Sequence, residues 1–74
     1  MKLLVADDHT LFRDGLVNLL EAAGFAVVGQ VGHGAATIVE ALALRPDVVL
    51  VDMDMDRIIA NAKQWRGRIA AVAR

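Results

Sequence analysis

The segment Asp47–Val51 (DVVLV) most constrains what this chain can fold into. It is too short for a helix of ordinary length, rich in β-branched residues and apolar on both faces, which predicts a buried strand. A strand that is apolar on both sides needs helices above and below it, as in a parallel sheet. Pro46 ends the preceding helix, because the residue before a proline is pushed out of the helical region.

Two other short apolar runs, Lys2–Ala6 and Phe25–Val28, are also predicted strands. A helix is predicted from Thr10, as N-cap, to Ala23, with Gly24 as the residue that ends it. Its expected inner face consists of apolar residues at helical spacing: Phe12, Leu16, Leu19, Leu20 and Ala23.

A second helix is predicted over residues 35–44, burying Ile38, Val39, Ala41 and Leu42. The order is therefore β-α-β-α-β, which favours a parallel sheet with right-handed crossovers. The fold class predicted for residues 1–55 is α/β.

Composition excludes several other classes of protein. With 74 residues the chain is one small domain, and its 57% hydrophobic content is too high for a disordered segment. Its apolar runs are too short to span a membrane, the N-terminus does not resemble a signal peptide, and we expect a cytoplasmic protein. There is no cysteine, so disulfides and thiolate metal sites are excluded.

Acidic residues follow two of the predicted strands. Asp7 and Asp8 come directly after the first strand, Asp52 comes directly after the third, and Asp54 lies just beyond. Strand ends of this kind are neighbours in a doubly wound sheet, and ligands bind in the crevice outside them. Each aspartate alone is explained equally well by a helix cap or a turn. Together they predict a site for a hard cation such as Mg²⁺.

Three segments, VADDHTLFRDGLVNLLE, VVGQVGHG and LRPDVVLVDMDM, carry a family resemblance. Over residues 1–55 the chain resembles the receiver domains of NarL/FixJ-like response regulators. The resemblance implies a flavodoxin-like (CheY-like) fold. It implies Asp52 as the phosphoacceptor, Asp7 and Asp8 as the Mg²⁺-binding pair, and Asp54 as a ligand through its backbone carbonyl.

The resemblance also implies a sensor histidine kinase as phosphoryl donor and a phosphoacceptor rather than an enzyme. We expect His9 and His33 to be structural. After Met55 the resemblance fails. The Thr/Ser that follows the fourth strand in the family is not identifiable, the lysine after a fifth strand has no counterpart, and no helix-turn-helix module follows.

Residues 56–74 form a basic tail with five basic residues against one acid, whereas residues 1–52 hold seven acids against three basic residues. Two structures are compatible with the tail. One is a third helix from Arg57 to Trp65, a turn at Gly67 and a fourth strand at residues 69–73, which puts Ala73 where the family has its hydroxyl. The other is a single amphipathic helix, which the alanine-rich end favours although Gly67 would cost about 1 kcal/mol inside it.

Two alternative functions remain. The chain could be a truncated or engineered receiver fragment that only self-associates, without signalling. A nucleotide-binding α/β fragment is a minor alternative, because residues 32–37 read G-x-G-x-x-T after a strand, but the third glycine of that motif is missing. No direct contact with nucleic acid is expected from the basic tail.

A homodimer is also predicted. The strand at Asp47–Val51 is apolar on both sides and has an open edge, and the resemblance implies a last helix over one face that this sequence lacks. A second chain would cover both the edge and the face. The C-terminal segment and the exposed sheet face are the expected contact, with Ile58, Trp65 and Ile69 in it.

Overall fold

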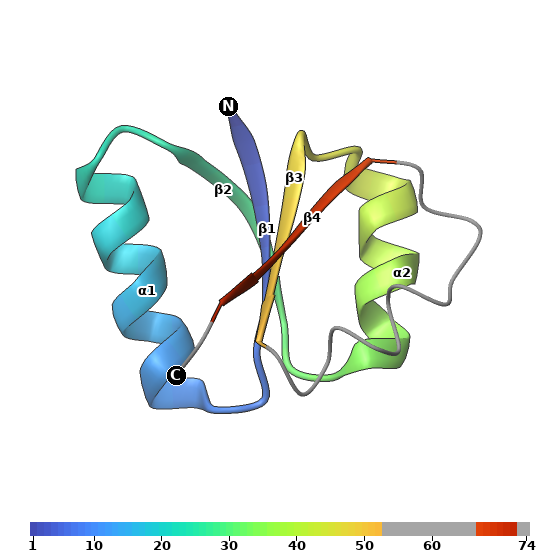
Figure 1. Cartoon of the computed structure of the whole chain (residues 1–74), viewed down its shortest axis with the longest axis horizontal. Helices are drawn as coiled ribbons and strands as arrows, with labels where there is room; N and C mark the ends of the chain where they lie inside the picture. The colour runs from blue at the N-terminus through green and yellow to red at the C-terminus, as the bar shows by residue number, and fades with distance from the viewer. Residues whose placement is uncertain (53–66, 73–74) are drawn as a thin grey trace.

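The computed structural model describes residues 1–52 and 67–72, with the side chains of residues 71 and 72 left aside. Its elements alternate between strands and helices, as the sequence predicts for most of the chain (Figure 1). In chain order they are β1 (Lys2–Ala6), α1 (Thr10–Ala22), β2 (Ala26–Val31), α2 (Gly34–Leu44), β3 (Val48–Asp52) and β4 (Arg68–Val72).

All strand pairs are parallel, and the strand order is β2-β1-β3-β4. The chain therefore moves outward from β1 to β2 and then crosses back over β1 to reach β3. Since parallel crossovers are right-handed, this reversal places α1 and α2 on opposite faces of the sheet, as Figure 1 shows. The reversal point lies between β1 and β3, which is where doubly wound sheets open a crevice for ligands.

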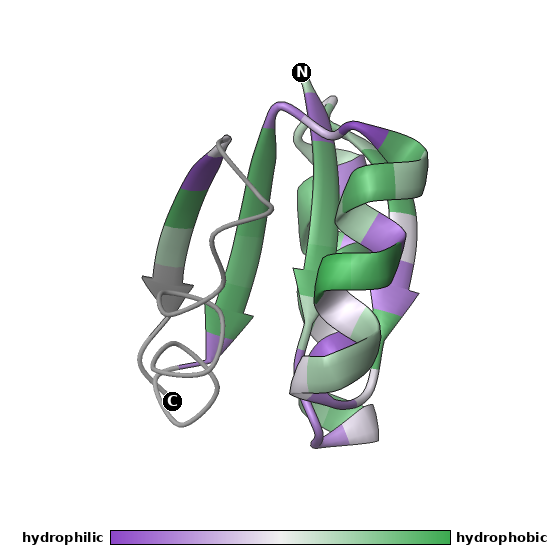
Figure 2. Cartoon of the chain, turned by 90° about the vertical axis from the view of Figure 1, so that its right-hand side faces the viewer, coloured by the Kyte–Doolittle hydropathy of each residue, from purple (hydrophilic) through white to green (hydrophobic). Residues whose placement is uncertain are grey.

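The core consists of the two central strands and the helix faces that pack on them. Leu4 and Val5 of β1 and Val49 of β3 are fully buried, and they point alternately to the two faces of the sheet. On the α2 side one apolar cluster contains Leu4, Ala6, Val31, Ala41, Val49 and Val51. The green colour of the central strands in Figure 2 reflects this continuous apolar character.

Local signals in the sequence explain the end of α1. Gly24 has φ +95°, a conformation that residues with a Cβ rarely adopt. The backbone N–H of Gly24 donates to the carbonyl of Glu21 at 3.0 Å, and that of Phe25 donates to the carbonyl of Leu20 at 3.1 Å. These two bonds form a Schellman motif, which confirms Gly24 as the residue that ends the helix.

The predicted start of α1 is wrong by one residue. His9 is the N-cap, with φ −97° and ψ 102°, and its side chain makes no capping bond to the described residues, while Thr10 already belongs to the helix. The reason is that the Asp7 carboxylate accepts the backbone N–H of His9 at 2.7 Å, which turns the chain one residue earlier than a threonine cap would.

The predicted inner faces of both helices are partly wrong. Val17 is the buried residue of α1, whereas Leu19 is 68% exposed. In α2 the buried positions are Gly34, Thr37 and Ala41, whereas Val39 and Leu42 are exposed. Both helices are apolar over more than one face, so hydrophobic spacing alone does not determine which face meets the sheet.

The single-helix hypothesis for the tail is wrong at residues 68–72, which form β4 in register with β3. The expected open edge at β3 is therefore occupied, because Val49 pairs with Ile69 and Val51 with Ala71. A strand here forms hydrogen bonds with the backbone groups of β3, and it lets Ile69 pack against the core cluster on the α2 side. These two contributions outweigh the helical preference of the alanines. The remaining predictions for the tail, including those for Ile58 and Trp65, lie outside the described residues.

Candidate functional site

Two buried aspartates lie at the carboxyl ends of the central strands. Ala6 pairs with Val51, so Asp7 and Asp52 are the next residue on each of two neighbouring strands. Asp7 is 2% exposed and Asp52 1% exposed, and the two are the buried acids among the described residues. Strand pairing thus brings together two residues that are 45 positions apart in the sequence. The structure places both where the strand-end argument predicts.

Hydrogen bonds fix Asp7 from both its backbone and its side chain. Its N–H donates to the Val31 carbonyl of β2 at 3.0 Å, and its carbonyl accepts a bond from Nη1 of Arg13 at 2.8 Å. Its carboxylate oxygen Oδ1 accepts the N–H of His9 at 2.7 Å. The loop between β1 and α1 therefore has a defined conformation that holds the Asp7 carboxylate at the edge of the sheet.

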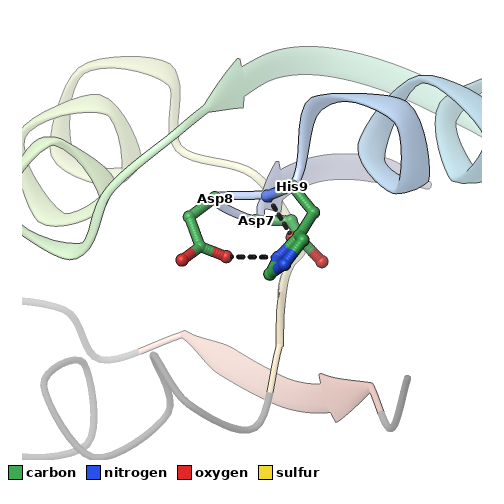
Figure 3. A group of neighbouring side chains, drawn as sticks. All are labelled: Asp7, Asp8 and His9. Atoms are coloured by element: carbon green, nitrogen blue, oxygen red, sulfur yellow. Dashed lines mark hydrogen bonds and ion pairs between the residues drawn. The ribbon is translucent and has the colours of Figure 1, made fainter.

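Asp8 and His9 form the solvent-facing part of this loop (Figure 3). The imidazole Nδ1 of His9 lies 2.8 Å from Oδ1 of Asp8 and 3.6 Å from Oδ1 of Asp7. The side chain of Asp8 is 55% exposed and that of His9 61% exposed. One ligand atom from each of the three residues lies within 4.8 Å of the others.

This donor set fits a hard divalent cation. Asp7, Asp8 and Asp52 supply carboxylate oxygens, the ligand type that Mg²⁺ prefers, from two neighbouring strand ends. Burying two carboxylates at neighbouring strand ends is costly, and a bound cation offsets that cost. Asp54, the expected carbonyl ligand, lies outside the described residues.

His9 and Arg13 contact the acidic residues in a way that the sequence alone does not predict. The ring of His9, for which we expect a structural role, contacts Asp8, and its position directly after the acidic pair is the available signal. The Arg13 side chain contacts the carbonyl of Asp7, six residues earlier in the chain. This contact cannot be predicted without knowing how α1 is rotated on the sheet.

The G-x-G-x-x-T segment comprises the two-residue loop between β2 and α2 and the first turn of α2. It follows β2, which is an edge strand, rather than one of the two strands at the reversal point. Nη1 of Arg13 lies 3.1 Å from the position that a Cβ on Gly32 would take, so a side chain of the protein itself packs at this loop. His33 is the extended N-cap of α2 and is exposed.

The doubly wound sheet and the acidic strand ends define an α/β domain with a candidate ligand crevice, and the family follows from a direct comparison. The family model of the response regulator receiver domain matches residues 3–60. The chain belongs to this family, as the sequence resemblance predicted.

Particular relatives agree with this assignment. Response regulator GacA of Pseudomonas syringae pv. syringae (strain B728a) is 44% identical over 59 residues, which cover 78% of this chain and 28% of the relative. A protein-glutamate methylesterase/protein-glutamine glutaminase of Anaeromyxobacter dehalogenans (strain 2CP-C) is 42% identical over 59 residues, covering 78% of this chain and 17% of the relative. The chain thus spans less than a third of the length of the curated relatives that it matches.

A solved structure shares the fold. The signal receiver domain of the response regulator NarL from Mycobacterium tuberculosis superimposes with a TM-score of 0.78 at 33% identity. The match covers 97% of this chain and 63% of that one. The flavodoxin-like receiver fold is therefore confirmed. Within the described part of the chain, neither helix is long and apolar enough to cross a membrane.

Proposed function

We propose that this chain accepts a phosphoryl group on Asp52 from the phosphohistidine of a sensor histidine kinase, in the cytoplasm, with Mg²⁺ bound by Asp7, Asp8 and Asp52 and by the Asp54 carbonyl. The observation that carries the proposal is the burial of Asp7 and Asp52 at adjacent strand ends, at the reversal point of the sheet. Membership of the receiver family supports the same assignment.

The chemistry is an in-line displacement at phosphorus. A carboxylate oxygen of Asp52 forms the new P–O bond while the P–N bond of the phosphohistidine breaks, and the electron pair of that bond stays on the imidazole nitrogen. The other nitrogen of the phosphohistidine ring carries a proton, so the ring leaves as a neutral histidine on the kinase, and the second product is an aspartyl phosphate. When bound, Mg²⁺ offsets the negative charge of the transferred oxygens.

The main contribution of the protein to this reaction is to hold the reacting carboxylates in position. Asp52 ends β3, beside the strand that Asp7 follows, and the hydrogen bonds of the β1–α1 loop fix the position of Asp7. Such pre-organisation lowers the barrier because little rearrangement is needed as charge develops. The chain is then a phosphoacceptor and substrate of the kinase rather than an enzyme in its own right.

Intact-mass measurement with acetyl phosphate and Mg²⁺ tests the proposal. We expect the wild type to gain one phosphoryl group, Asp52→Asn to gain none, and chelation of Mg²⁺ to abolish the gain. Asp14→Asn is the matched control, because Asp14 is an exposed aspartate on α1 and its variant should be modified like the wild type. Unchanged phosphorylation of the Asp52→Asn protein contradicts the assignment.

A second proposal is self-association through the sheet face on the α1 side, together with the C-terminal segment. On this face Val48 and Leu50 of β3 and Ala70 of β4 are only half-buried, because α1 packs mainly against β1 and β2. In Figure 2 α2 likewise lies over β1 and β2, with β3 and β4 to one side. A second copy of this chain is the proposed occupant, and its net charge of −1 opposes pairing only weakly.

This dimer would exist in a signalling receiver or in a fragment that only self-associates. The phosphorylation test above separates the two functions, because a module without signalling needs no reactive Asp52. Neither function requires direct contact between this chain and nucleic acid.

A further inference from the structure

Arg13 joins the two loops at the carboxyl edge of the sheet. Its Nη1 donates to the carbonyl oxygen of Asp7 in the β1–α1 loop at 2.8 Å. The same Nη1 lies 3.1 Å from the Cβ position of Gly32 in the β2–α2 loop. The Arg13 side chain is half-buried, and its Nε is buried without a hydrogen-bond partner among the described residues.

The contact with Asp7 acts on the backbone of the metal-binding loop. Only three residues, Asp7 to His9, separate β1 from α1, and the carboxylates of Asp7 and Asp8 both belong to them. A charged donor on the Asp7 carbonyl fixes the peptide that links these two residues, and it therefore constrains the directions of their carboxylates.

The loop at β2 is shaped to admit this guanidinium. A Cβ at residue 32 would lie 3.1 Å from Nη1, a tighter approach than nine in ten real Cβ contacts, so the guanidinium would have to shift by a few tenths of an ångström. The Arg13 guanidinium is thus the group that a side chain at position 32 would meet.

We infer that Arg13 is a positioning residue for the acidic pocket, and that Gly32 lets the Arg13 guanidinium keep this position without a shift. This inference rests on the proposed function, since it concerns how the chain binds Mg²⁺ and accepts a phosphoryl group. Under this inference, one residue of α1 and one of the β2–α2 loop help to hold the groups that bind Mg²⁺ and accept the phosphoryl group. Those groups themselves lie at the ends of β1 and β3.

Calorimetric titration with Mg²⁺ and acetyl phosphate labelling test the inference on the full chain. We expect Arg13→Met to weaken Mg²⁺ binding about tenfold, as loss of an outer-shell partner typically does, and to slow phosphorylation at subsaturating Mg²⁺. Saturating Mg²⁺ should restore most of the rate. Arg13→Lys keeps the charge but not the forked geometry, and it should recover part of the affinity.

A double-mutant cycle isolates the role of Gly32. Gly32→Ala should weaken Mg²⁺ binding several-fold in the wild type but add little in the Arg13→Met background, because the group that it displaces is then gone. Gly15→Ala is the matched control. Its Cβ meets nothing within 4 Å, so Mg²⁺ affinity should not change.

The outcomes separate this inference from the proposed function. A wild type that neither binds Mg²⁺ nor is phosphorylated contradicts the proposed function. A wild type that binds Mg²⁺, with an Arg13→Met variant that binds it equally or more tightly, overturns only the positioning role, even if the variant melts at a lower temperature. Should Arg13→Met fail to fold, Gly32→Ala decides the question: unchanged Mg²⁺ affinity in that variant overturns the inference.

Discussion

Asp52 is expected to weaken the protein when the pocket contains no cation. It is almost fully buried, and the neighbouring strand ends in Asp7, which is equally buried. Two carboxylates in such a place repel each other, and each has lost much of its hydration. The residue that the proposed function needs therefore lowers the stability of the protein when no cation is bound.

Asp52→Asn should accordingly stabilise the Mg²⁺-free protein, by about 1 kcal/mol in the free energy of unfolding. The same variant should lose most of the stabilisation that millimolar Mg²⁺ gives the wild type, because a carboxylate ligand is gone. Urea denaturation with and without Mg²⁺ measures both effects. Asp14→Asn should show neither, since Asp14 is exposed on α1. A destabilised Asp52→Asn protein in chelator would be incompatible with carboxylate repulsion.

The sequence predicts Asp7, Asp8 and Asp52 as one site because strand ends follow from hydrophobic runs, and parallel strand ends lie at one edge. It does not predict His9 or Arg13. Their contacts depend on the rotamers of long side chains and on the rotation of α1, and neither is determined by the spacing of apolar residues. The position of the acidic residues is thus predictable from the sequence, whereas the residues that contact them are not.

At the scale of elements, the same substitution should have opposite effects at two glycines, one inside α1 and one just after its end. Gly15 lies inside the helix, and a Cβ there meets nothing within 4 Å. Gly24 lies at the end of the helix with φ +95°. The first glycine costs helix stability, and the second provides a conformation that alanine adopts only with strain.

Gly15→Ala should raise the free energy of unfolding by about 0.5–1 kcal/mol, because alanine restricts the unfolded chain and favours the helix. Gly24→Ala should lower it by about 1–2 kcal/mol. Urea midpoints at one fixed protein concentration compare the two variants, so that any self-association affects both equally. If both substitutions shifted the midpoint in the same direction, the assigned end of α1 would be wrong.

The prediction of elements fails where tertiary contacts outweigh local preference. Residues 68–72 contain two consecutive alanines and favour a helix by composition, yet they pair with β3. An unpaired β3 edge would leave its backbone groups without partners, and Ile69 would lose its contact with the core cluster. Hydrophobic periodicity reflects only the local preference of residues 68–72 for helix or strand. It contains no information on the unpaired edge of β3 that these residues cover.

At the scale of the whole molecule, α1 and α2 pack mainly against β1 and β2, so these two helices leave the β3–β4 half of the sheet less covered among the described elements. Val48, Leu50 and Ala70 remain half-buried on the α1 side. Apolar surface contributes roughly 25 cal/mol per Å² when buried, so a few hundred Å² is worth several kcal/mol. That is comparable with the whole stability of a small domain.

We therefore expect the chain to dimerise at micromolar concentration, with a melting temperature that rises with protein concentration. Sedimentation equilibrium should give a mass above that of the 7.9 kDa monomer. Ala70→Glu should weaken the dimer, because it places a charge on the proposed contact. Ala43→Glu introduces the same charge at an exposed position of α2 and should leave the dimer intact. Trp65→Ala tests the contribution of the C-terminal segment in the same way.

The pocket lies at the carboxyl edge of the strands and the proposed contact on a face of the sheet, so the two should act independently. Beryllofluoride with Mg²⁺ should raise the melting temperature by the same amount at every protein concentration and leave the sedimenting mass unchanged. A large change in mass on adding beryllofluoride would mean that the pocket and the contact are coupled. A cooperatively melting monomer, with a melting temperature independent of concentration, would show that the half-buried residues on this face need no second chain.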